Sequence, residues 1–223
     1  QSYFASSGYA AVWATENTRQ EIFAAMKRRE VYATTGPRIT LRFFAGWDFT
    51  EDHAQQADIA PAGYRLGVPM GGDLFQSEET TNKAPTFLIR ATKDPEGANL
   101  DRVQIIKGWR DESGKLQEKV HNVIWSGDRK LDSNGALPSV GSTVDLSDAS
   151  YQNTIGSPEL STTWRDPDFN EAERAVYYVR VLEIPTPRWT VYDAKFYGQE
   201  LPQNSPLVTE ERAYSSPIWY TPE

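Results

Sequence analysis

Acidic side chains gather in two turn-rich segments and are the first candidates for chemistry. Asp94, Glu96 and Asp101 lie in one segment, and Asp128 and Asp132 lie in the other. Glycoside hydrolysis requires two carboxyl groups roughly 5–10 Å apart in a cleft, a distance that spacing along the chain does not define. Asp also favours turns, because its side chain bonds to the nearby backbone. The turn interpretation is the simpler one, so we predict no catalytic residue in either segment.

Patterns of metal ligands are incomplete in this chain. Residues 132–135 (Asp-Ser-Asn-Gly) match part of an EF-hand loop, but a cation, Lys130, stands two residues earlier and no Glu closes the loop. His53 and His121 are the only two histidines, too few for a three-His zinc site, and the absence of Cys excludes thiolate ligands and thiol nucleophiles. We therefore expect no metal site and no cofactor in this chain, an ordinary turn at 132–135, and a surface or rim position for His121.

The tryptophans raise the main question about ligand binding. Exposed, roughly coplanar indole rings could form a platform for sugars, whereas core packing is the simpler use of such large apolar side chains. A carbohydrate-binding β-sandwich module that uses exposed Trp residues is therefore the alternative function. The six candidates for such a platform are Trp47, Trp109, Trp125, Trp164, Trp189 and Trp219.

Composition excludes several classes of function. The 223 residues include 31 acidic and 23 basic side chains, for a formal net charge of −8, which argues against binding to a phosphate backbone. No apolar run approaches the roughly 20 residues that span a bilayer. Nine Phe, seven Trp and eleven Tyr can supply the buried area that a modest aliphatic content lacks. We expect a folded acidic protein with no nucleic-acid partner and no membrane span.

The elements that must position these side chains are mostly strands. Residues 15–30 predict one helix, with a capping box from Thr18 to Glu21 and an apolar stripe that includes Phe23 and Met26. Residues 46–85 are rich in turn formers and predict a large loop across the core, with short strands within it as an open alternative. Alternating apolar residues predict the remaining elements as strands, mostly joined by turns, which indicates a mainly β protein with an antiparallel β-sandwich. These predicted strands cover residues 31–35, 38–45, 86–92, 102–110, 119–125, 175–184, 189–196 and 216–220.

Seven segments spread over nearly the whole chain closely resemble the C-terminal portion of the DUF3604 family. They are residues 7–19, 25–39, 71–73, 93–101, 104–109, 183–189 and 211–222. The resemblance implies a larger, often exported bacterial parent, so we expect a periplasmic or extracellular location. Its N-terminal part would be similar to the polymerase and histidinol phosphatase (PHP) superfamily, whose distorted (β/α) barrel holds divalent metals with His, Asp and Glu ligands. Those ligand motifs precede Gln1, so none maps onto this sequence.

The resemblance also implies a division of the chain at residue 30. Residues 1–30 would be the last loop and helix of the upstream barrel, and residues 31–223 the β-sandwich domain. Glu16, Asn17 and Arg19 open that helix and could face an anionic ligand at the barrel mouth, with simple capping as the alternative.

The expected function is a non-catalytic C-terminal β domain that packs on or gates a PHP-like, metal-dependent hydrolase barrel of unknown substrate. Its partners would be that barrel or a second copy, contacted through residues 1–30. Apolar residues of this segment must then pack on the β domain, dimerise, or leave an exposed apolar patch. They are Tyr3, Phe4, Val12, Trp13, Phe23 and Met26.

Overall fold

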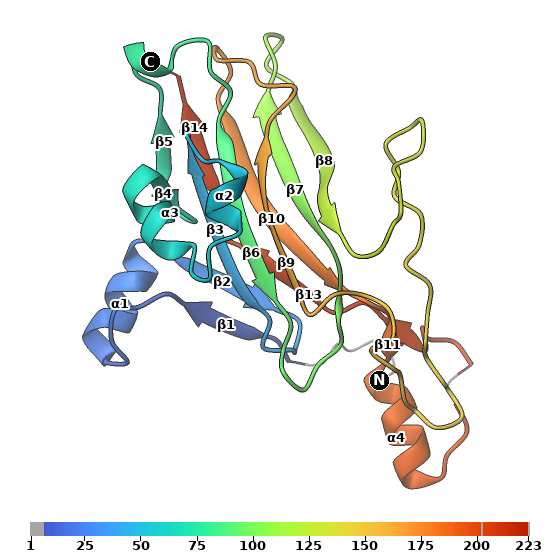
Figure 1. Cartoon of the computed structure of the whole chain (residues 1–223). Helices are drawn as coiled ribbons and strands as arrows, with labels where there is room; N and C mark the ends of the chain where they lie inside the picture. The colour runs from blue at the N-terminus through green and yellow to red at the C-terminus, as the bar shows by residue number, and fades with distance from the viewer. Residues whose placement is uncertain (1–6, 202, 223) are drawn as a thin grey trace.

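Two β-sheets packed face to face form the centre of the molecule (Figure 1). The computed structural model describes residues 7–201 and 203–222. In the large, eight-stranded sheet, the central strand is β10 (Ala175–Glu183), flanked on one edge by β7 (Leu100–Arg110) and then β8 (Leu116–Trp125). On the other edge lie β13 (Arg212–Ser215), β14 (Ile218–Thr221), β2 (Val31–Thr34), β1 (Tyr9–Val12) and β5 (Asp73–Phe75).

The second sheet is smaller and entirely antiparallel. Its order is β4 (Gly67–Pro69), β3 (Thr40–Gly46), β6 (Thr86–Thr92) and β9 (Glu159–Arg165). Two short strands, β11 (Thr186–Pro187) and β12 (Val208–Thr209), pair with each other separately. The predicted antiparallel β-sandwich is therefore confirmed, although the sequence did not indicate β9.

Aromatic rings fill the space between the sheets. Phe43 and Phe87 on the small sheet stack with their centroids 5.6 Å apart, and Phe87 meets Tyr177 of the large sheet at 4.6 Å. All three side chains are completely buried. Each residue lies in the inward phase of its strand, since successive side chains of a strand point to opposite faces. Aromatic area thus supplies much of the hydrophobic stabilisation, as the composition predicted.

Residues 46–85 contain two short strands, which the sequence prediction allowed for, and helices, which it did not. They form α2 (Glu51–Ala54), α3 (Ala60–Leu66), β4, β5 and a 3-10 turn, η1 (Glu78–Thr80). Helices α2 and α3 cover the outer face of the small sheet, where Phe44 and Leu88 pack into a second apolar cluster. The helices have only four and seven residues, so the turn-forming residues around them hide any helical period in the sequence.

Residues 189–196 form a helix, α4 (Trp189–Tyr197), where a strand was predicted. The β-prone residues of this segment misled the prediction, but the buried positions Thr190, Val191 and Ala194 follow the helical period. Gly198 ends the helix in the left-handed conformation at φ 62°, which favours glycine. No helix of the described chain has the length and apolar character needed to cross a membrane.

Helix α1 (Arg19–Lys27) is shorter than predicted, and its largest apolar side chains face solvent. The Thr18 side chain accepts a hydrogen bond from the Glu21 N–H, which confirms the predicted N-cap. Phe23 is 62% exposed and Met26 is 51% exposed. By contrast, Trp13 packs on the core, and its indole donates to the Leu41 carbonyl. Two other apolar residues of this segment, Tyr3 and Phe4, lie outside the described residues.

Candidate functional site

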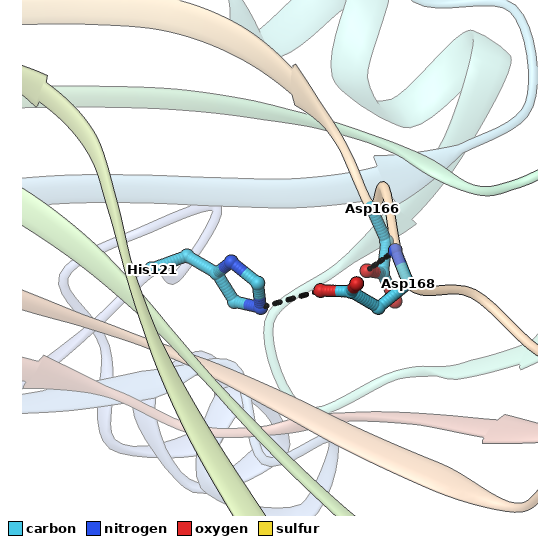
Figure 2. Close-up of side chains that lie close together, drawn as sticks. All are labelled: His121, Asp166 and Asp168. Carbon is cyan, nitrogen blue, oxygen red and sulfur yellow. Dashed lines mark hydrogen bonds and ion pairs between the residues drawn. The ribbon is translucent and has the colours of Figure 1, made fainter. Parts of the chain in front are cut away.

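One histidine and two aspartates meet where β8 faces the end of β9, as Figure 2 shows. Their candidate ligand atoms, on His121, Asp166 and Asp168, all lie within 4.8 Å of one another. The His121 side chain is only 10% exposed, and its ring contacts that of Trp164 with centroids 4.8 Å apart. The residue as a whole is half-buried beside the half-exposed Asp168, so His121 lies at the rim of the core and not on the open surface. Alternation along β8 did not reveal these neighbours of His121, because two residues that follow β9, Asp166 and Asp168, complete the cluster.

The Asp166 carboxylate is already saturated by neighbours from the large sheet. Lys107 Nζ donates to its Oδ2 at 2.6 Å, and both side chains are almost fully buried. The Tyr177 hydroxyl donates to the same oxygen at 2.7 Å, and the Asp168 N–H donates to Oδ1 at 2.9 Å. Burial raises the pKa of the Tyr177 hydroxyl, which keeps it protonated as a donor. A metal ion at Asp166 would have to displace a buried ammonium group.

The charges of this cluster balance without a metal ion. Lys119 donates to the Asp168 carboxylate, and this hydrogen bond lowers the pKa of that carboxyl. Burial lowers the pKa of His121, so its imidazole is neutral at pH 7. Two ammonium groups then offset two carboxylates, and a divalent cation would add charge that nothing in the cluster compensates. The arrangement fits a structural ion-pair network better than a metal centre.

A second candidate site lies beside α4, at one end of the molecule (Figure 1). A pocket of about 240 Å³, called the Glu183 pocket below, is lined by two carboxylic residues, Glu183 and Glu211, and by the rings of Tyr151, Trp189 and Tyr192. A neighbouring pocket of about 430 Å³ shares Trp189 and Glu211 and includes Arg212 in its lining. The chain thus brings together segments that are far apart in sequence.

Glu183 is a buried carboxylic residue of the Glu183 pocket with a strongly shifted pKa. The residue is 1% exposed, and its Oε1 has no hydrogen-bond partner among the described residues. Burial, followed by the nearby carboxylates of Glu211 and Asp94, raises the pKa of Glu183 to about 8. Lys93 opposes this effect in part. At neutral pH the carboxyl is therefore mostly protonated and can donate a hydrogen bond.

Buried polar atoms without partners concentrate around these two pockets. The described chain has eight such side-chain atoms, and three of them, on Thr34, Glu183 and Arg212, belong to residues that line the pockets. A fourth, Thr190 Oγ1, follows Trp189 on α4. Buried polar groups are normally hydrogen-bonded, and leaving one unsatisfied costs free energy. Four of the eight unpartnered atoms thus lie on residues that line these pockets or on α4.

The residues predicted to face a ligand lie at the start of α1. Glu16, Asn17 and Arg19 are all exposed and flank the N-cap Thr18. They lie next to one another along the chain and do not line the Glu183 pocket. Whether they meet an anionic ligand at a barrel mouth stays a prediction.

Asp side chains of the two acidic segments bond to the protein itself, both across the fold and within a turn. Asp94 accepts the Arg38 N–H at 2.7 Å, and Asp101, which is 1% exposed, pairs with Arg129 at 2.5 Å. The Asp132 Oδ1 accepts the N–H groups of residues 134 and 136, each at 2.8 Å. This is the ordinary turn that the sequence predicted there.

The tryptophans are mostly engaged in packing. Trp219, on β14, is 44% exposed, whereas the other six indole side chains are half-buried. Trp219 and Trp109 line one groove of about 580 Å³ between the ends of β7, β10 and β14. A sugar platform of two fully exposed rings is not present in the described chain. In this groove, the exposed ring of Trp219 and the half-buried ring of Trp109 both contribute to the lining.

Comparison with known proteins identifies one family. The model of the DUF3604 family, described as a protein of unknown function, matches residues 1–222. No curated protein and no solved structure matches the chain.

We predict that Lys107→Met lowers the free energy of unfolding by about 3–5 kcal/mol, because it leaves the buried Asp166 carboxylate without its counterion. Urea denaturation at pH 7 measures the loss. The matched control is Lys119→Met, which removes an ion pair with both partners about half exposed and should cost less than about 1 kcal/mol. Equal stability losses in the two variants would contradict the role of the buried pair.

We also predict that Glu183 makes stability depend on pH. The folded chain holds this proton up to about pH 8, whereas an unfolded Glu loses it near pH 4.5. The contribution of Glu183 to the free energy of unfolding is therefore fully present below about pH 4.5 and is lost as the pH rises to 8. Between pH 5 and 9 the loss is roughly 2–4 kcal/mol. Glu183→Gln should flatten that decline in thermal or urea unfolding, while Glu112→Gln, in the exposed β7–β8 hairpin, should not. Parallel pH profiles for Glu183→Gln and the wild type would refute the prediction.

Proposed function

We propose that this chain, which belongs to the DUF3604 family, is a non-catalytic β-sandwich domain that packs on, or gates, a PHP-like metal-dependent hydrolase barrel. In this proposal the divalent metals and their ligands belong to the barrel. The chain would shape the entrance to that site and supply no metal ligand of its own. The exposed apolar face of α1 is the observation that carries the proposal.

Helix α1 exposes its two largest apolar side chains, which is unusual for a surface helix of an isolated domain. Such helices normally bury their apolar stripe and expose their polar residues. In α1 the buried residue is the small Ala25, whereas Phe23 and Met26 project into solvent one turn apart. Strand β1 and the Trp13 indole attach the segment firmly to the sandwich. A fixed helix that presents large apolar side chains is suited to packing against another domain.

The barrel is the occupant favoured by the family resemblance, in which residues 1–30 continue directly from it. The proposal therefore requires a coding sequence upstream of Gln1 that contains a His-x-His motif and later acidic metal ligands. Reading that sequence is the cheapest check. An upstream region without such ligands would remove the barrel from the proposal.

We predict that the double change Phe23→Ser and Met26→Ser weakens binding of this chain to the separately expressed barrel by at least tenfold. Each side chain contributes roughly 1.5–3 kcal/mol when buried, and 1.4 kcal/mol corresponds to a factor of ten. Hydrogen exchange of residues 19–27, with and without the barrel, reports where contact occurs. Leu116→Ser is the control, because Leu116 is 80% exposed in the distant β7–β8 hairpin. If sedimentation instead shows a homodimer that the double change dissociates, α1 contacts a second copy and the barrel proposal is refuted.

Carbohydrate binding is the second candidate, and the groove between Trp109 and Trp219 supports it. An indole ring can stack on the apolar face of a sugar, and Trp219 is accessible for that contact. Under this proposal Trp219→Ala abolishes the retardation of the chain in gels that contain a soluble polysaccharide. Tyr197→Ala, which removes a more exposed ring on α4, leaves the retardation unchanged. Equal migration of the wild type with and without every polysaccharide tested would eliminate this function.

A further inference from the structure

The Glu183 pocket combines acidic groups with aromatic walls. Two carboxylic residues, Glu183 and Glu211, lie among the rings of Tyr151, Trp189 and Tyr192. No basic side chain lines the pocket within the described ranges. Carboxylates and aromatic faces both attract cations, the first by charge and the second through the quadrupole of the ring. The lining therefore favours a positively charged group.

The Glu183 backbone is paired, but a carboxyl oxygen of its side chain has no partner among the described residues. Glu183 ends β10, and its N–H donates to the Glu211 carbonyl at 2.9 Å, which ties the two acidic residues together. Its buried Oε1 has no hydrogen-bond partner in the described structure. Gly97 lies next to this carboxyl, since a Cβ on it would be in ordinary van der Waals contact with the oxygen at 3.5 Å. A buried carboxyl without a hydrogen-bond partner, on a residue that lines a pocket, is a feature that a bound donor would satisfy.

We propose that the Glu183 pocket binds a small organic cation, a primary ammonium or guanidinium group, with Glu183 as its ion-pair partner and the aromatic rings as its walls. The volume of about 240 Å³ is below that of sites for drug-sized ligands and suits a group of a few heavy atoms. A hard metal ion would require six or more oxygen ligands, whereas three of the lining residues offer rings. The α1 surface is not involved, so this inference and the docking proposal can fail independently.

Ionisable neighbours on each side of Glu183 define how binding responds to pH. Glu211 and Asp94 repel negative charge on Glu183, and Lys93 partly offsets them while its Nζ donates to the carbonyls of residues 94, 95 and 97. Burial raises the pKa of Tyr151 and of Tyr192, so both stay neutral up to pH 9. A bound cation would favour the charged form of Glu183. Binding therefore releases a proton at neutral pH and strengthens as pH rises.

The test uses n-butylamine as the cationic probe and n-butanol and glucose as neutral controls. Saturation-transfer NMR and calorimetry at pH 6.5 and 9 measure binding to the intact chain. An alkylammonium stays charged at both pH values, as Lys does in peptides. We expect at least a tenfold lower Kd for n-butylamine at pH 9 and no binding of glucose. Equal binding of n-butanol and n-butylamine, or no saturation transfer to n-butylamine at 50 mM, would overturn the proposal.

Two variants connect the signal to this pocket. Glu183→Gln keeps the shape of the side chain and should abolish both binding and its pH dependence, whereas Glu112→Gln should change neither. Tyr192→Leu should weaken binding severalfold by removing one aromatic wall. Binding that persists in Glu183→Gln would place the amine elsewhere and refute the assignment.

A free amine and a lysine side chain of another protein offer the same chemistry. Nα-acetyl-lysine methylamide distinguishes them, because it presents the ammonium on a peptide backbone. If it binds as well as n-butylamine, the pocket accepts a side chain. If only n-butylamine binds, the ligand is a free small molecule.

Discussion

The buried ion pair between Lys107 and Asp166 joins the two sheets and constrains the positions of the side chains around it. Lys107 and Tyr177 point inward from neighbouring strands of the large sheet, and both bond to Asp166 at the end of the small sheet. A buried charge is tolerated only with close partners, so this contact fixes how β9 approaches the large sheet. Asp168, two residues later, then falls beside Lys119 and His121. The cluster of His121, Asp166 and Asp168 is thus explained by the way the two sheets are joined.

Sequence patterns predicted the long strands well and the helices poorly. The strand at residues 86–92 was predicted with its observed ends, and the fold class follows from such alternation. Helix α4 was mistaken for a strand because its residues are β-prone, and packing against β11 overrides that preference. Helices α2 and α3 are too short to show a period. These two helices form because they cover the apolar face of β3 and β6. That face exists only once the sheet has folded.

The Glu183 pocket could not be predicted from the sequence, for a different reason. Glu183 and Glu211 are 28 positions apart in the chain, and nothing local indicates that they share a pocket. One signal was available, because Glu183 continues the inward phase of Tyr177, Val179 and Val181 along β10. An acidic residue in that phase predicts either a buried ionisable group or the end of the strand. The residues singled out from the sequence, at the start of α1, were chosen because the family resemblance places that helix start at a barrel mouth, and this criterion does not report on burial.

The position of β14 has a consequence for how the molecule assembles during translation. This strand comprises residues 218–221, yet it lies inside the large sheet, antiparallel to β10 and parallel to β5. Until the ribosome has released these residues, β5 has no neighbour in the large sheet and part of β10 keeps an open edge. Open strand edges invite pairing with other chains. The nascent polypeptide therefore passes through a stage that is prone to aggregation and ends only when Thr221 has emerged.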